Sequence, residues 1–308
     1  MEFGCHLPMF GPIATRHNVL TFARRMEALG YDSLWASDHI VLPYTIRSRY
    51  PYSETGQFPL PANANFLEPF VTLALVAGVT ERVKLGTTIL VLPHRHPVLA
   101  AKMAANLDHL SNGRMILGVG VGWMEEEITL LGAPFAKRGA WSDEAIKIMR
   151  VCWSQEKASY KGQFFSFDEI GCFPQPVRKN IPILIGGHTP RALRRVAELG
   201  DGWHAAFPAP DKLEEGLRVL REECKKAGRR FEDVAITLRV GVAIRKEKSA
   251  DRRPMTGTPE EIVSDIRRYK ALGVTTLLLE SRQRDLDDMI QIHETIARDI
   301  RPAVARRA

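Results

Sequence analysis

Three segments of the chain share one form, and together they decide the fold: Arg24-Arg25-Met26-Glu27-Ala28-Leu29-Gly30-Tyr31-Asp32, Arg194-Arg195-Val196-Ala197-Glu198-Leu199-Gly200-Asp201-Gly202 and Arg267-Arg268-Tyr269-Lys270-Ala271-Leu272-Gly273-Val274-Thr275. Each is the end of an amphipathic helix, then a glycine, then an apolar strand. Because glycine takes positive φ at little cost, we expect Gly30, Gly200 and Gly273 to end these helices in the left-handed conformation. The repetition indicates one βα architecture over the whole chain.

The length and composition suit one large α/β domain. The chain has 308 residues, of which 45% are hydrophobic and 26% charged. A (β/α)8 barrel needs about 250 residues, so about 60 residues remain for insertions. We therefore predict a single TIM-barrel domain over residues 1–308.

Apolar and amphipathic runs fit eight strands and the helices between them. The strands are predicted at residues 3–7, 33–36, 83–92, 115–122, 181–185, 202–205, 234–244 and 274–280, and the clearest helices at 18–29, 69–78, 97–110 and 141–153. A lid-like loop rich in proline and aromatic residues follows strand two at 43–69, and a segment with a hairpin precedes strand five at 155–180. A charged loop covers 245–256.

Charge and cysteine content exclude several classes of protein. The formal net charge is +7, but no block of Lys and Arg occurs, so we expect small molecules rather than nucleic acid as partners. The chain begins without a basic-then-apolar leader and has no apolar run of about 18 residues, which predicts a cytoplasmic protein with no membrane partner. Cys5, Cys152, Cys172 and Cys224 show no paired spacing, so we expect four reduced, structural thiols.

Working residues of such barrels lie at the carboxyl ends of the strands. The turn Gly186-Gly187-His188-Thr189 leaves strand five and opens a helix, where free backbone N–H groups favour an anion such as phosphate. The alternative is a plain turn in which Thr189 caps the helix. Asp38-His39 follows strand two, and His39 suits proton exchange near neutral pH; alternatively, the pair is a polar strand end.

Two further patterns have more than one interpretation. Gly118, Gly120 and Gly122 alternate along strand four, which leaves room for a flat ligand or relieves crowding inside the barrel. The acidic run 125–127 could join His94 and His96 in a metal site, but His204 is the only comparable residue at another strand end, so we expect no metal.

Several motifs along nearly the whole chain resemble the luciferase-like monooxygenase superfamily, and most of all its F420-dependent oxidoreductase branch. They are Ser37-Asp38-His39, Gly86-Thr87-Thr88-Ile89-Leu90-Val91-Leu92-Pro93, Ser111-Asn112-Gly113-Arg114, Gly118-Val119-Gly120-Val121-Gly122-Trp123 with Glu126-Glu127, and Ile185-Gly186-Gly187 through Gly200-Asp201-Gly202-Trp203. The resemblance implies a TIM barrel with the deazaflavin F420, or FMN in sister branches, held in its mouth. It also implies a homodimer.

The same resemblance assigns roles to individual residues. A non-prolyl cis peptide is implied at Thr88-Ile89, behind the cofactor ring, and His39 becomes the proton partner of hydride transfer. The implied cofactor-binding residues are Asp38, at the deazaflavin ring; Thr88, Ile89, Val91, Gly122, Trp123 and Glu126, around it; and Gly186, Gly187, His188 and Thr189, at the phosphate.

Two departures from the family pattern bear on the substrate. Sugar-phosphate dehydrogenases of this superfamily have Glu at the position of Trp123 and Trp at the position of Pro43, so we do not expect sugar phosphate oxidation. With Trp35, Trp123 and the aromatic loop 44–66 near the mouth, we expect an apolar or planar substrate such as an enone, imine, nitroaromatic or ketone.

Hydride transfer between F420 and such a substrate is the leading hypothesis. The closest alternative is an FMNH2-dependent monooxygenase, since both cofactors present a phosphate and a tricyclic ring. A third hypothesis is a barrel that binds flavin without turnover. An aldolase or isomerase that uses no flavin is the least favoured hypothesis, because no Lys is clearly placed at a strand end.

Overall fold

Eight parallel strands form a closed barrel at the centre of the computed structural model, which describes residues 1–248 and 251–306. β13 pairs with β1, and β3 pairs with β5 through Leu85 and Met115, which closes the ring. This confirms the predicted (β/α)8 barrel. The strands are β1 (Glu2–His6), β2 (Ser33–Ala36), β3 (Lys84–Thr87), β5 (Met115–Gly120), β8 (Ile183–Gly186), β9 (Gly202–Ala206), β10 (Ala235–Gly241) and β13 (Thr276–Glu280).

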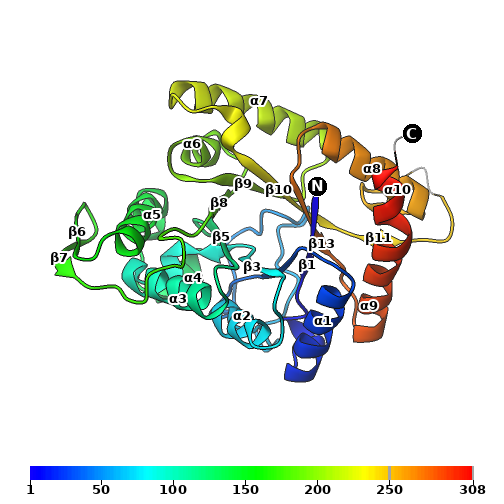
Figure 1. Ribbon diagram of the computed structural model, residues 1–308, viewed down its shortest axis with the longest axis horizontal. Helices are drawn as coiled ribbons and strands as arrows, with labels where there is room; N and C mark the ends of the chain where they lie inside the picture. The colour runs from blue at the N-terminus through cyan, green and yellow to red at the C-terminus, as the bar shows by residue number, and fades with distance from the viewer. Residues whose placement is uncertain (249–250, 307–308) are drawn as a thin grey trace.

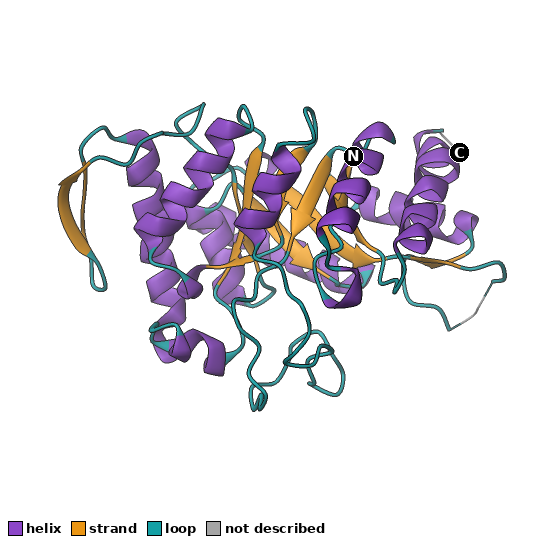
Figure 2. Ribbon diagram, turned by 90° about the horizontal axis from the view of Figure 1, so that it is seen from below, coloured by secondary structure: helices purple, strands orange, loops and turns teal. Residues whose placement is uncertain are grey.

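Helices surround the barrel, as Figures 1 and 2 show. Proline in the first turn begins six of them, because its fixed φ suits that position. In α8, Thr258 and Glu261 add a capping box. The helices are α1 (Arg16–Ala28), α2 (Pro69–Ala77), α3 (Pro97–Leu110), α4 (Glu125–Leu130), α5 (Arg138–Ser154), α6 (Pro190–Leu199), α7 (Pro210–Lys226), α8 (Pro259–Ala271), α9 (Leu286–Thr295) and α10 (Arg301–Ala305).

The insertions lie outside this frame. Between β2 and α2 the chain forms no regular helix or strand, and a bridge between Phe10 and Phe66 ties the end of the segment to the body. The second insertion contains an antiparallel hairpin of β6 (Ala158–Lys161) and β7 (Ser166–Ile170), which projects from the barrel in Figure 1. Short strands β11 (Ala243–Ile244) and β12 (Thr256–Gly257) flank the charged loop, of which residues 249–250 lie outside the description.

Glycine stands between a helix and the next strand at three positions, but for two different physical reasons. Gly30 and Gly273 take φ of +73° and +96°, as expected for glycine after a helix. The expectation for Gly200 was wrong, because its φ is −95°. A Cβ at Gly200 would lie 2.9 Å from Cδ1 of Ile185, so this glycine allows close packing of α6 on β8 rather than a left-handed turn.

Trp35 fills the barrel interior. Its side chain is fully buried with Leu184 and Leu278, and a Cβ on Gly86 would lie only 2.2 Å from its ring. The expectation that Trp35 helps to shape the substrate site near the mouth was therefore wrong. The four cysteines are buried and free, and no helix in the described ranges is long and apolar enough to cross a membrane.

Candidate active site

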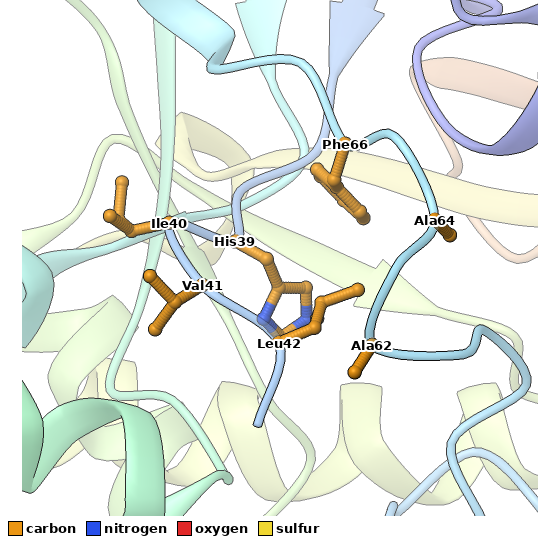
Figure 3. Close-up of a pocket in the computed structure, with 7 residues that line it drawn as sticks. All are labelled: His39, Ile40, Val41, Leu42, Ala62, Ala64 and Phe66. Atoms are coloured by element: carbon orange, nitrogen blue, oxygen red, sulfur yellow. The ribbon is translucent and has the colours of Figure 1, made fainter. Parts of the chain in front are cut away.

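His39 lies just beyond the carboxyl end of β2 and lines a cavity of about 310 Å³. The other lining residues are apolar, and Figure 3 shows the imidazole among Leu42, Ala62 and Phe66. The rings of Phe58 and Phe66 meet it edge-on, with centroid separations of 5.0 and 5.3 Å. The histidine thus sits beside a space that is lined by apolar residue types and is large enough for a small organic molecule.

A buried carboxylate on α4 holds His39. Nδ1 of His39 lies 2.7 Å from Oε2 of Glu127, whose other oxygen accepts the backbone N–H groups of Ile40 and Val41. Burial alone would raise the pKa of Glu127, but the hydrogen bond and charge of His39, together with His94, lower it. Glu127 therefore stays ionised near neutral pH.

Asp38 is the centre of a second buried group. Its side chain is fully inaccessible, and Arg95 donates to its two oxygens at 2.7 and 2.9 Å. Arg95 also pairs with Glu68, the N-cap of α2, and the N–H of Val91 donates to Asp38. Burial would raise the pKa of Asp38, but contacts with His94 and Arg95 lower it to about 2. Asp38 thus joins β2, α2 and the segment after β3.

The cis peptide implied by the resemblance is present at Thr88-Ile89, between β3 and β4 (Leu90–Val91). Arg239 donates to the Thr88 carbonyl at 2.6 Å and pairs with Glu280 on β13. His204 lies 2.9 Å from the Thr88 hydroxyl. Side chains of β9 and β10 therefore hold this segment directly, and Glu280 on β13 holds Arg239. The single strand predicted over 83–92 is accordingly interrupted here.

The alternating glycines of β5 make room for this segment. A Cβ on Gly118 would lie 2.1 Å from the Thr87 carbonyl oxygen, and one on Gly120 would lie 2.0 Å from Cδ1 of Ile89. Of the two interpretations, relief of crowding therefore explains Gly118 and Gly120. Gly122 has φ of +77° beyond the strand end, beside the side chain of Val91.

The turn between β8 and α6 carries the predicted anion site. Gly187 has φ of +110°, and Thr189 caps the helix by accepting the N–H of Ala192. Within the described ranges, the backbone N–H groups of Gly187, His188 and Thr189 donate to no protein group. Capping by Thr189 and a free set of N–H donors therefore coexist in this turn.

Aromatic side chains of the lid-like loop pack around Trp123 and His39. Trp123 packs against Tyr50 and Phe58 with centroid separations of 5.1 and 5.5 Å, and its ring lies 6.1 Å from that of His39. Glu126 accepts the Ser48 hydroxyl at 2.7 Å and the Arg47 N–H at 2.6 Å. Trp123 thus belongs to an aromatic cover, and Glu126 anchors the loop to α4.

The comparison with known families decides the assignment. A family model described as Luciferase-like monooxygenase matches residues 1–256. The chain belongs to the luciferase-like monooxygenase family. The uncharacterized protein Rv0940c of Mycobacterium tuberculosis (strain ATCC 25618 / H37Rv) is 34% identical to this luciferase-like protein over 271 residues, covering 87% of the chain and 91% of the relative. An F420-dependent glucose-6-phosphate dehydrogenase of Microbacterium testaceum (strain StLB037) is 31% identical over 266 residues, covering 83% and 73%.

Solved structures share the fold. Monooxygenase RslO1 from Streptomyces bottropensis superposes with a TM-score of 0.80 at 21% identity, covering 99% of this chain and 100% of its own. An F420-dependent secondary alcohol dehydrogenase in complex with an F420-acetone adduct gives 0.80 at 20% identity, covering 99% of each chain. The luciferase-like family is one of F420- or flavin-dependent oxidoreductases.

Most of the residues that hold the site of this luciferase-like protein are not predictable from local sequence patterns. In the sequence, Glu127 is part of a possible metal-binding run and of the motif Glu126-Glu127, neither of which indicates its contact with His39, and no pattern marks Arg95 or Arg239. Among residues 1–248 and 251–306, no three His, Cys, Asp or Glu side chains are placed for a metal. The position of Glu127 on a helix directly after a barrel strand was the one available signal. The predicted cofactor residues lie at the carboxyl ends of β2, β3, β5 and β8, and their contacts with a cofactor remain a prediction.

Proposed function

We propose that the protein transfers a hydride between F420 and a small apolar or planar organic molecule, with His39 as the proton partner. The observation that carries this proposal is the placement of His39, which contacts Glu127 on one side and lines a cavity of about 310 Å³ among apolar residues on the other. F420-dependent enzymes among the relatives and structural neighbours support the choice of cofactor.

The residues present fit an anionic, tricyclic cofactor. The free N–H groups at Gly187, His188 and Thr189 open a helix of ten residues, which suits a phosphate. The bound deazaflavin would supply the carbon that gives or takes the hydride. The protein would hold the phosphate at this turn and move a proton at His39. Trp123 and Phe58 would keep water from the substrate.

The surroundings of His39 favour an apolar substrate over a sugar phosphate. Trp123 stands where sugar-phosphate dehydrogenases have a carboxylate, and here it packs against aromatic side chains of the lid-like loop. Reduction of an enone or ketone takes one hydride to carbon and one proton to carbon or oxygen, so a single proton donor suffices.

Anaerobic oxidation of reduced F420 by a panel of enones, imines, nitroaromatics and ketones tests the proposal. The recovery of the visible absorbance of oxidised F420 measures turnover. In a His39→Asn variant, whose amide can still donate to Glu127, we expect kcat to fall by about 10²–10⁴-fold. Oxygen-dependent turnover of reduced FMN, with no oxidation of F420, would instead identify a monooxygenase.

We also propose that two copies associate through α2 and α3, which pack side by side. Val71, Leu99 and Leu110 on these helices are 69%, 52% and 75% exposed, and such apolar surface favours association. Sedimentation velocity at micromolar concentration should show a dimer that Val71→Glu weakens, whereas a monomer in the unaltered protein would contradict this proposal.

A further inference from the structure

The two oxygens of the Glu127 carboxylate contact different groups. Oε1 accepts the N–H of Ile40 at 2.6 Å and that of Val41 at 3.1 Å, whereas Oε2 lies 2.7 Å from Nδ1 of His39. The side chain is fully buried. The carboxylate therefore cannot turn away from His39 without breaking two backbone hydrogen bonds.

The state of this carboxylate decides where the histidine carries its proton. An ionised carboxylate only accepts hydrogen bonds, so a neutral imidazole beside it must hold its proton on Nδ1. Nε2 is then the acceptor, and it has no hydrogen-bond partner in the part of the chain that the structure describes. We propose that Glu127 is a positioning residue that fixes the Nδ1–H tautomer of His39 and so reserves Nε2 for proton exchange with the substrate.

The packing around the ring supports a fixed orientation. Phe58, Phe66 and Trp123 surround the imidazole with centroid separations of 5.0, 5.3 and 6.1 Å. His94 approaches the same carboxylate, with its Nε2 3.5 Å from Oε2 of Glu127. The ring is thus held at one edge by a hydrogen bond and laterally by aromatic contacts. The inference rests on the proposed role of His39, but the tautomer itself can be measured without turnover.

Glu127→Gln is the decisive variant because it makes a specific prediction. The backbone N–H groups of Ile40 and Val41 require an oxygen, so the amide NH2 must face Nδ1 of His39. Nδ1 then has to accept, and the proton moves to Nε2. Long-range ¹H–¹⁵N correlation spectra of ring-labelled protein, at a pH where the imidazole is neutral, distinguish the two tautomers. The signal of His39 is assigned by its loss in His39→Asn.

We expect the Nδ1–H tautomer in the unaltered protein and the Nε2–H tautomer in Glu127→Gln. In the direction that oxidises an alcohol substrate, the hydride goes to F420 and the hydroxyl proton goes to Nε2 of His39. An Nε2–H tautomer removes this proton acceptor, so kcat for alcohol oxidation should fall by about 10²–10⁴-fold while the Kd for F420 changes little. Glu127→Asp keeps the charge and should retain the Nδ1–H tautomer and part of the activity. Glu125→Gln is the matched control, since the Glu125 side chain is exposed on the same helix; neither tautomer nor kcat should change.

An Nε2–H tautomer in the unaltered protein would overturn the inference, and this measurement needs no variant. An unchanged tautomer in folded Glu127→Gln would overturn it as well. If the tautomers behave as expected but no substrate oxidises reduced F420, the positioning of His39 stands and the proposed function fails. The two ideas can therefore fail separately.

Discussion

Removal of the Arg95 guanidinium should destabilise the protein strongly. Asp38 is fully buried and receives two of its three hydrogen bonds from Arg95, at 2.7 and 2.9 Å. Arg95→Met would leave that carboxylate with the hydrogen bond from Val91 and the weaker contact with His94, whose Nδ1 lies 3.7 Å away. Breaking a buried ion pair from one side costs about 3–5 kcal/mol, so we expect the free energy of unfolding at pH 7 to fall by about that amount.

Two measurements distinguish loss of the ion pair from loss of packing in Arg95→Met: the pH dependence of the stability loss, and the effect of also replacing Asp38. In the unaltered protein the pKa of Asp38 is lowered to about 2, so its ionised form stabilises the fold above about pH 4 and this contribution is lost as pH falls toward 2. In Arg95→Met the deficit should shrink toward acid pH, because Asp38 can take up a proton. The double variant Asp38→Asn/Arg95→Met should recover about 1–3 kcal/mol relative to Arg95→Met.

Urea unfolding followed by circular dichroism measures these differences. Arg25→Met is the matched control, because the Arg25–Glu294 pair is exposed by 48% and 34% and such pairs contribute less than about 1 kcal/mol. A loss below about 1 kcal/mol in Arg95→Met, or no recovery in the double variant, would show that the Asp38–Arg95 pair does not stabilise the fold as described.

Two further predictions concern packing and acid stability. Gly118→Ala should lower the free energy of unfolding in urea by about 1–3 kcal/mol, because its Cβ would lie 2.1 Å from the Thr87 carbonyl oxygen. Gly78→Ala is the control and should leave this free energy unchanged, since the nearest atom to its Cβ would be 3.6 Å away. Equal effects of the two substitutions would contradict the described packing of the barrel. Burial lowers the pKa of His6, His204 and His293 to about 3, so the unfolded chain binds more protons below its histidine pKa of about 6.5. The free energy of unfolding should therefore fall with pH from about 6.5 toward 3, by up to about 1.4 kcal/mol per unit and per histidine; a flat profile over that range would be the contrary result.

Local patterns predicted the order of elements well. The helix expected at 97–110 has those bounds in α3, and α8 begins with Thr258 as its N-cap, in a capping box with Glu261. Capping and helical periodicity act over one or two turns, so the sequence carries them directly. The cis peptide at Thr88-Ile89 was implied by resemblance and is also present.

Contacts between residues that barrel closure brings together could not be predicted from local sequence patterns. Glu127 reaches His39 across 88 residues, and Arg95 reaches Asp38 across 57. No local pattern relates these positions. Trp35 shows a second limit, because all four residues of β2 are buried. Strands covered on both faces lack the alternation that tells an inward from an outward side chain.

The most direct test of the proposed function is a titration of the apo-protein with oxidised F420 and, separately, with FMN, each followed by fluorescence at physiological salt. We expect tight binding of F420 and weak binding of FMN, with F420 affinity retained in His39→Asn. Tight binding of FMN with weak binding of F420 would contradict deazaflavin hydride transfer and make an oxygen-dependent monooxygenase the working assignment.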